Sequence, residues 1–303
     1  MDLTSLFQKK LLLVTGKGGV GKTMVAANLA LEAARSGKKV FMIESTASDQ
    51  IGPLLGVGAP GHQVFRVYEN LYVANFNSDL NFRDFISIHL GFPGLFQKVF
   101  SKNIVKSFVK MVPGIAEITL LGQLYYYATM EKELQFDLII LDAYASGHFL
   151  SLLKTPQAIL QAGFSGPIIE ETLKIDALLQ SSEQTGIVLV NNPEELIISE
   201  TLDFLERLKG VSSLSPIGLF INRYEKPFSY EGYEGALYDL AYALHKKAKR
   251  VEKTTEAFLA QLQESGLYER GAVHLLPEWR TIKEPLTMVS AQNFFEEAST
   301  CHL

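Results

Sequence analysis

Short apolar segments alternate along the chain with longer segments in which apolar residues recur every three or four positions. Most of the short segments are nearly continuous apolar runs, a pattern typical of strands buried on both faces of a parallel sheet. They lie at 11–16, 40–45, 71–76, 137–143, 186–192, 217–223 and 273–277. The pattern predicts an α/β fold with a doubly wound, mostly parallel sheet flanked by helices.

Three helical segments are longer than a simple crossover between parallel strands requires. They cover about residues 78–130, 148–183 and 226–265, and they predict a helical layer added to the sheet. The chain contains no internal repeat, low-complexity tract or Pro/Ser-rich linker. We therefore expect residues 1–303 to form a single domain with these helical elaborations.

Composition and charge exclude several classes of protein. Hydrophobic residues make up 47% of the chain and charged residues 20%, as in ordinary globular proteins. A net charge of -5 argues against nucleic acid as a partner. The N-terminus lacks the pattern of a signal peptide, and no run of about 18 apolar residues occurs, so we expect a soluble cytoplasmic protein. The single cysteine, Cys301, leaves no CxxC pair to bind zinc.

A phosphate-binding loop is predicted between the first apolar segment and the helical segment that follows it. Residues 16–23 fit the pattern G-x-x-x-x-G-K-[ST]. Backbone N–H groups of such a loop converge on phosphates, while Lys22 pairs with the β- and γ-phosphates of ATP and Thr23 binds Mg²⁺. The predicted nucleotide-binding residues of the loop are Gly18, Gly19, Val20, Gly21, Lys22, Thr23 and Met24.

The same loop carries a second lysine, Lys17, that has no obvious role in its own phosphate site. The stretch GKGGVGKT resembles the deviant phosphate loop of the ATPase class that includes the arsenical-pump, tail-anchored-protein targeting, cell-division and plasmid-partition ATPases. In that class the first lysine crosses a two-fold interface to the partner's nucleotide. The resemblance implies a dimer in which Lys17 acts in trans on the transferring phosphoryl group, much as an arginine finger does.

Three downstream segments resemble the arsenical-pump and tail-anchored-protein targeting branch, the ArsA-like ATPases. They are VPGIAEITLLGQL at 112–124, FDLIILDAYASGHFLSLLKTP at 136–156 and NNPEELIISETLDFLERL at 191–208. In the second of them, Asp142 ends a predicted strand at the carboxyl edge of the sheet, where it can hold Mg²⁺ through water.

The resemblance also implies roles for residues at the ends of other predicted elements. Gly147 would offer a backbone N–H beside the γ-phosphate, and His148 would sense the nucleotide. Asn222 would read the edge of the adenine base, with Pro277 and Glu278 over the ring. A packed or surface histidine is the alternative for His148, and an ordinary strand-end turn is the alternative for the last three residues.

The chain departs from the family pattern after the second predicted strand. The family aspartate that positions the attacking water is replaced here by Thr46, which leaves Glu44 and Asp49 as the nearby carboxylates. We expect Glu44, at the end of the strand, to orient the water; Asp49 is the other candidate, and it could equally be the N-cap of a helix. Because of this departure, two alternatives stay open: the chain hydrolyses ATP weakly, or it is a hydrolysis-deficient subunit of a paired complex.

Taken together, these residues predict an ATP-binding and ATP-hydrolysing dimeric switch that uses Mg²⁺. The dimer is either a homodimer or a heterodimer with a related ATPase. A metalloid-pump ATPase is disfavoured because the chain has no thiol cluster to bind trivalent arsenic.

A basic amphipathic pattern suggests where a partner would bind. Lysines recur every four residues between 98 and 110 among apolar residues, which predicts a surface for an anionic membrane or a protein client. A helix that covers the sheet with its lysines in water is the alternative. The lysines are Lys98, Lys102, Lys106 and Lys110.

Overall fold

The protein is described by a computed structural model that covers residues 3–46, 49–89, 113–163, 165–268, 272–277, 285–296 and 298–302. Within these ranges nine strands form one sheet, in the order β3-β4-β2-β5-β1-β6-β7-β8-β9. The strands are β1 (Leu11–Gly16), β2 (Val40–Glu44), β3 (Phe65–Arg66), β4 (Leu71–Asn75), β5 (Leu138–Ala145), β6 (Thr185–Asn191), β7 (Pro216–Tyr224), β8 (Ala272–Pro277) and β9 (Ser299–His302).

All neighbouring strands from β4 to β8 pair in parallel, and these seven strands coincide with the seven predicted segments. The predicted fold class is therefore confirmed. The two edge strands, β3 and β9, pair antiparallel with β4 and β8. They were not predicted, because β3 is only two exposed residues and β9 reads STCH, without an apolar run.

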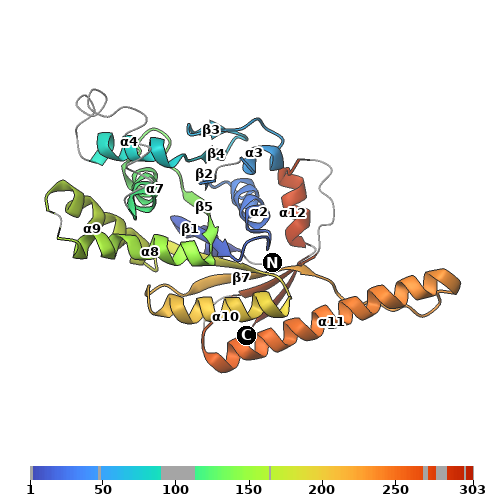
Figure 1. Cartoon of the computed structure of the whole chain (residues 1–303). Helices are drawn as coiled ribbons and strands as arrows, with labels where there is room; N and C mark the ends of the chain where they lie inside the picture. The colour runs from blue at the N-terminus through green and yellow to red at the C-terminus, as the bar shows by residue number, and fades with distance from the viewer. Residues whose placement is uncertain are drawn as a thin grey trace.

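Helices cover both faces of the sheet (Figure 1). They are α1 (Thr4–Phe7), α2 (Lys22–Arg35), α3 (Ile51–Leu54), α4 (Ser78–His89), α7 (Ile115–Tyr125), a π-helical turn (Tyr126–Met130), α8 (Ser146–Gln161), α9 (Pro167–Gln180), α10 (Glu195–Lys209), α11 (Gly235–Ser265) and α12 (Met288–Glu296).

Strand β1 shows why the apolar segments are continuous. Leu11 and Leu13 belong to the core on the side of α7, α8, α9 and α10, whereas Leu12 and Val14 belong to the core around α2 and α12. Successive side chains of a strand point to opposite faces, so a strand covered on both faces needs apolar residues at every position. The functional edge of the sheet is thus supported by two cores.

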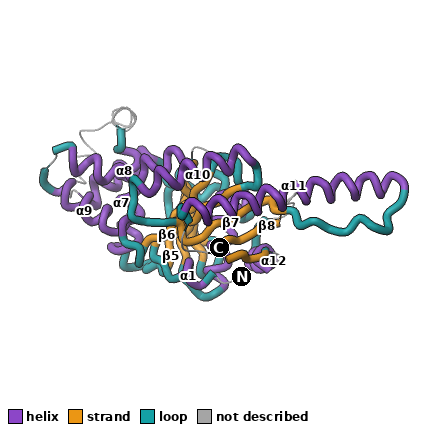
Figure 2. Tube along the Cα trace, turned by 90° about the horizontal axis from the view of Figure 1, so that it is seen from below, coloured by secondary structure: helices purple, strands orange, loops and turns teal. Residues whose placement is uncertain are grey.

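The described helices also occupy all three segments predicted as helical elaborations. Helices α4 and α7 lie in the first, α8 and α9 in the second, and α11 in the third. The first half of α11 and the loop before it extend away from the sheet (Figures 1 and 2). That the whole chain is one domain stays a prediction.

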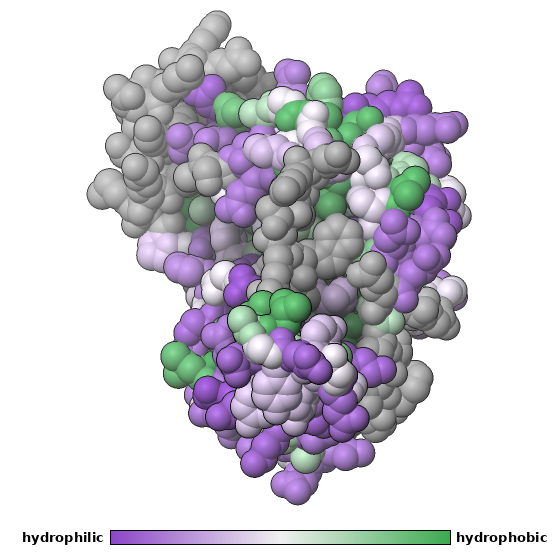
Figure 3. Space-filling view, turned by 90° about the vertical axis from the view of Figure 1, so that its right-hand side faces the viewer, coloured by the Kyte–Doolittle hydropathy of each residue, from purple (hydrophilic) through white to green (hydrophobic). Residues whose placement is uncertain are grey.

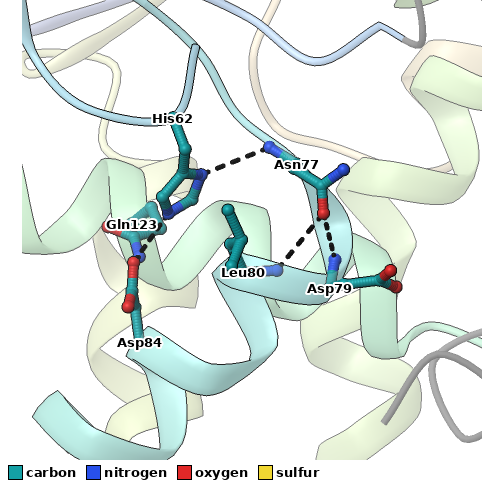
Figure 4. Close-up of polar contacts among 6 residues, drawn as sticks. All are labelled: His62, Asn77, Asp79, Leu80, Asp84 and Gln123. Carbon is teal, nitrogen blue, oxygen red and sulfur yellow. Dashed lines mark hydrogen bonds and ion pairs between the residues drawn. The ribbon is translucent and has the colours of Figure 1, made fainter. Parts of the chain in front are cut away.

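A polar network ties the helical layer to the loop before β3 (Figure 4). The side-chain oxygen of Asn77 accepts hydrogen bonds from two N–H groups in the first turn of α4 and so caps this helix. The backbone N–H of Asn77 donates to Nδ1 of His62 at 3.3 Å. Because Nδ1 is an acceptor, Nε2 of His62 carries the proton toward Asp84 on α4, at 2.7 Å. The same Asp84 oxygen accepts a hydrogen bond from Gln123 on α7 at 2.9 Å.

Candidate functional site

The phosphate-binding loop connects β1 to α2, as the sequence predicts. Gly19 and Gly21 have positive φ angles of 83° and 94°, which an L side chain adopts only with strain. A Cβ atom at Gly21 would collide with the Asn222 amide, and one at Gly16 would lie closer to the Val190 carbonyl oxygen than real Cβ atoms approach. At Gly18 a Cβ would meet open space. Gly16 and Gly21 are therefore needed because neighbouring atoms leave no room for a side chain, whereas Gly18 faces open space.

A cavity of about 480 Å³ opens above this loop, at the carboxyl ends of β1, β2 and β5. Its volume is typical of small-molecule sites, and open α/β sheets bind ligands at this edge. The lining residues are Gly18, Gly19, Gly21, Lys22, Thr23, Thr46, Gln50, Asp142, Ala143, Tyr144 and Ala145.

Thr23 and Asp142 meet at the floor of the cavity. The Thr23 hydroxyl donates a hydrogen bond of 2.5 Å to Oδ2 of Asp142, and Oδ1 of the same carboxylate is buried without a partner among the described residues. Burial raises the pKa of Asp142 to about 6, although Thr23 and Lys22 act in the opposite direction. A hydroxyl beside a carboxylate with an unused oxygen is a donor set that fits Mg²⁺.

The side chain of Lys22 folds back onto its own loop. Its ammonium donates a hydrogen bond of 3.1 Å to the Lys17 carbonyl oxygen. Burial lowers the pKa of Lys22, and the Asp142 carboxylate raises it in part. A partly buried ammonium that has lost water gains most from an anion placed beside it. Lys22 thus fits its predicted pairing with phosphate.

Glu44 ends β2 directly beside Asp142 in the parallel register of β2 and β5. It is fully buried and accepts hydrogen bonds from the Gln50 N–H at 3.1 and 3.2 Å. Burial, and then the neighbouring Asp49 carboxylate, raise the pKa of Glu44 to about 8, against the Gln50 N–H. Glu44 therefore keeps its proton to a higher pH than an ordinary glutamate does.

Asp49 lies at the start of α3. Its Oδ1 accepts a hydrogen bond of 3.0 Å from the Gly52 N–H in the first turn of this helix. This contact is the capping role that was the alternative for Asp49. The choice between Glu44 and Asp49 as the water-orienting residue stays a prediction.

Lys17 forms an ion pair with Glu200 of α10 in the same chain. Their side chains are 35% and 40% exposed, so water screens the pair and its contribution to stability is small. Glu200 lies in the segment 191–208, but sequence reasoning assigned it no role. No local pattern links residues 183 positions apart.

Two residues at the end of β7 hold the loop from the other side. The Asn222 amide donates to the Val20 carbonyl at 2.9 Å, and the Arg223 guanidinium donates to the Gly19 carbonyl at 3.4 Å. Arg223 has a φ of 58°, which is uncommon for a residue other than glycine. Arg223 was not predicted as part of the site, because a positive φ cannot be read from the sequence.

Pro277 ends β8 and lines a second cavity of about 300 Å³, together with Tyr224 and Phe228. The predicted roles of Asn222 and Pro277 toward adenine stay predictions. Glu278 and the four lysines between 98 and 110 lie outside the described residues.

Tyr144 connects the ends of β1, β2 and β5. Its carbonyl accepts a hydrogen bond of 3.0 Å from the Thr15 hydroxyl, and its phenol lies 3.3 Å from the Ser45 hydroxyl. His148 is exposed in the first turn of α8, with its ring centroid 6.3 Å from that of Tyr144. Sequence reasoning missed Tyr144 because only the fold brings it to Ser45.

A parallel sheet with a glycine-rich loop between its central strand and a helix defines a class of protein. Such a loop, followed by a lysine and a threonine that meets an aspartate of the adjacent strand, is the phosphate-binding site of P-loop nucleoside triphosphatases. Within this class, residues 9–164 match the family model described as Anion-transporting ATPase, the ArsA-type ATPases. This match covers more than half of the 303 residues, and the chain belongs to this family.

Several relatives carry names that agree with this family. The chain is 28% identical over 225 residues to the ATPase BagA of Mycobacterium tuberculosis, which covers 71% of this chain and 65% of the relative. It is 28% identical over 157 residues to the ATPase ASNA1 homolog 2 of Paramecium tetraurelia, which covers 52% and 46%. It is 22% identical over 281 residues to a putative arsenical pump-driving ATPase of Aquifex aeolicus, which covers 86% and 67%. The chain thus spans less than two thirds of the length of the first of these relatives.

Proposed function

We propose that the chain binds ATP with Mg²⁺ and hydrolyses it as a dimeric switch that acts on a protein or membrane partner. The observation that carries the proposal is the hydrogen-bonded pair of Thr23 and Asp142, which lines the same cavity as the phosphate-binding loop. Membership of an ATPase family supports the nucleotide. A homodimer and a heterodimer both fit these observations, and a cytoplasmic location stays a prediction. No helix among the described residues is long and apolar enough to span a bilayer.

The loop and its neighbours bind the phosphates. The backbone N–H groups of residues 18–24 and the Lys22 ammonium neutralise the phosphate oxygens. Thr23 and Asp142 would hold Mg²⁺, which would supply positive charge against the phosphate groups. The raised pKa of Asp142 favours this role, because a cation beside a buried carboxylate restores its ionised form.

Glu44 is the proposed water-orienting residue. It lies beside Asp142 at the end of the adjacent strand, where a water can be placed against the γ-phosphate. A carboxyl with a pKa near the working pH changes between proton donor and acceptor at small cost. Asp49 is the competing residue, although the Gly52 N–H already engages one of its oxygens.

Lys17 is the proposed trans-acting lysine, and Glu200 holds it in cis in the structure described here. For Lys17 to reach the nucleotide of a second subunit, its ammonium must leave Glu200. Because both groups are partly exposed, this exchange costs little free energy. The γ-phosphate of the partner's ATP would then replace the Glu200 carboxylate as the anion for Lys17.

Two variants of the loop test the proposal. Lys22→Ala should abolish ATP binding in calorimetry, whereas Lys17→Ala should bind ATP and lose both turnover and the ATP-dependent dimer. Glu200→Gln, as the matched control on the other side of the ion pair, should keep turnover and favour the ATP-bound dimer. If Lys22→Ala binds ATP normally, the assignment of the phosphate loop is wrong. If Lys17→Ala hydrolyses ATP at the normal rate, Lys17 does not act in trans.

A second candidate function is a nucleotide-binding subunit that does not turn over. The observation that favours it is Thr46, which lines the cavity where the family carries an aspartate. Single-turnover measurements with Mg²⁺ and ATP separate the two candidates. Release of phosphate from the purified chain supports the hydrolase, and stable binding of intact ATP supports the second candidate.

A further inference from the structure

Strand β5 continues past Asp142, whereas its neighbour β2 ends at Glu44. The last pair in the register of these two strands is Glu44 with Asp142, so the parallel ladder stops there. Ser45 and Thr46 follow directly, and Thr46 lines the cavity above the phosphate-binding loop. We call residues 44–46 the cavity wall. On the side of β5, the position of this wall beyond Glu44 depends on side-chain contacts.

The hydroxyl groups of Tyr144 and Ser45 connect β5 to the cavity wall. Ser45 donates a hydrogen bond of 3.2 Å to the carbonyl oxygen of Phe76, which follows β4. A serine hydroxyl has only one proton, so in its 3.3 Å contact with the Tyr144 phenol the serine accepts and the tyrosine donates. The two hydroxyls thus form a chain of hydrogen bonds from β5 across the cavity wall to the end of β4.

Tyr144 is itself held at its backbone and at its ring. Its carbonyl oxygen accepts a hydrogen bond of 3.0 Å from the hydroxyl of Thr15, a fully buried residue of β1. Its ring packs against the hydrophobic core on the side of α7, α8, α9 and α10. A side chain that is fixed at both ends presents its hydroxyl in one place, which is what a group that positions a neighbour requires.

The cavity wall is also held from β4, by contacts that do not involve Tyr144. The Thr46 N–H donates to Oδ1 of Asn75 at 3.3 Å, and the Phe76 N–H donates to the Glu44 carbonyl oxygen at 2.8 Å. Loss of the Tyr144 hydroxyl would therefore loosen the cavity wall on one side and leave it attached on the other. Small displacements of groups around a reacting centre slow the chemical step more than they weaken substrate binding.

We propose that Tyr144 is a positioning residue for ATP hydrolysis, whose hydroxyl acts through Ser45 to hold Glu44 and Thr46 against the γ-phosphate. This inference rests on the proposed function, because it concerns the same cavity. It assigns the Tyr144 hydroxyl no contact with the nucleotide. The hydroxyl makes no contact with the phosphate-binding loop among the described residues, so nucleotide affinity and turnover should respond differently to its loss.

Tyr144→Phe removes the hydroxyl and keeps the ring in the core. The affinity for ATP, measured by calorimetry, should stay within about twofold of the wild-type value, whereas kcat should fall by about tenfold. Ser45→Ala removes the acceptor of the Tyr144 hydroxyl and should lower kcat in the same way. In the Ser45→Ala background, Tyr144→Phe should cause no further loss, because the hydroxyl then has no partner on the cavity wall. Ser45→Thr keeps a hydroxyl and should recover most of the turnover.

Tyr268→Phe is the matched control for the loss of a tyrosine hydroxyl. Tyr268 is buried, its hydroxyl donates to the Ala272 carbonyl oxygen at 3.2 Å, and it is not among the residues that line the cavity. Tyr268→Phe should lower the thermal midpoint about as much as Tyr144→Phe does and leave kcat unchanged. If the Tyr144 hydroxyl served the stability of the fold alone, the two variants would behave alike.

Binding of ADP with aluminium fluoride, an analogue of the transition state, gives a second measurement that does not need turnover. Tyr144→Phe should bind ADP as the wild type does and bind ADP with aluminium fluoride about tenfold more weakly. The role of Tyr144 is wrong if Tyr144→Phe turns over as fast as an active wild type, or if it slows Ser45→Ala further. These two results leave the proposed hydrolase intact. A wild-type chain that binds ATP and releases no phosphate would overturn the proposed hydrolase, and this role of Tyr144 with it.

Discussion

The carboxyl edge of the central strands and the exposed first half of α11, residues 235–250, which we call the arm, show two different ways in which this chain places polar groups. At the sheet edge, Glu44 and Asp142 follow strand residues that belong to two cores, and burial raises the pKa of both carboxyl groups. On the arm, charged and apolar side chains are exposed (Figure 3), and the described residues pack on only one side of the helix. The difference shows that the fold holds the polar groups of the site in place, whereas the described residues hold few side chains of the arm.

The largest effect on stability is expected at Gly16, where the chain lies against the backbone of the adjacent strand β6. Gly16→Ala should destabilise the fold by about 3 kcal/mol or more, because the new Cβ collides with the Val190 carbonyl of the adjacent strand. Gly18→Ala, at a glycine with open space, is the matched control and should change the free energy of unfolding by less than about 1 kcal/mol. Urea denaturation of both variants measures the difference, and equal values would show that the edge is less rigid than its packing indicates.

The next effect concerns the chemistry of the buried edge. Glu44→Gln should keep ATP affinity and slow turnover by about 100-fold, because the amide cannot accept a proton from water. Asp49→Asn should slow turnover much less, since Asp49 serves the first turn of α3. Steady-state phosphate release at saturating Mg²⁺ and ATP measures both. If only Asp49→Asn stalls turnover, the two roles are reversed.

Without nucleotide, the free energy of unfolding should depend on pH because of Glu44 at the same edge of the sheet. Folding raises the pKa of Glu44 from 4.5 to about 8, so the folded state binds this proton more tightly than the unfolded state does. The resulting contribution to the free energy of unfolding is fully present below pH 4.5 and is lost as the pH rises to 8. Between pH 6 and 8 the free energy of unfolding should fall by about 1.4 kcal/mol per pH unit. Glu44→Gln should flatten this slope, and so should Mg²⁺ with ATP, because the cation favours ionised carboxylates. A wild-type slope that survives Glu44→Gln would assign the proton to another group.

The smallest effect is expected on the arm. Leu240→Ala at low protein concentration should change the thermal midpoint of the monomer by about 1 °C or less, since a mostly exposed leucine loses little buried area. Leu141→Ala, at a fully buried position of β5, is the matched control and should cost about 2–5 kcal/mol. A large loss of stability in Leu240→Ala would mean that the arm packs within its own chain.

Much of the fold could be predicted from local pattern. The seven parallel strands follow from apolar runs, because a strand covered on both faces must be apolar at every position. The two antiparallel edge strands escaped prediction, since β3 is short and exposed and β9 is polar in sequence. Edge strands bury little surface, so they leave a weak hydrophobic signal.

The sequence by itself determined the glycine-rich loop between β1 and α2, its two lysines and the position of Glu44 at the end of β2, whereas β5 continues past Asp142 to Ala145. These features depend on residues that are close together along the chain, where turn chemistry and burial act directly on the order of residue types. Only the tertiary structure decided that Glu200 holds Lys17, that Asn222 holds the loop through Val20, and that the arm stands away from the sheet. Such contacts join residues that are far apart in sequence. The residue types alone do not indicate these partners, because only the folded sheet brings them together.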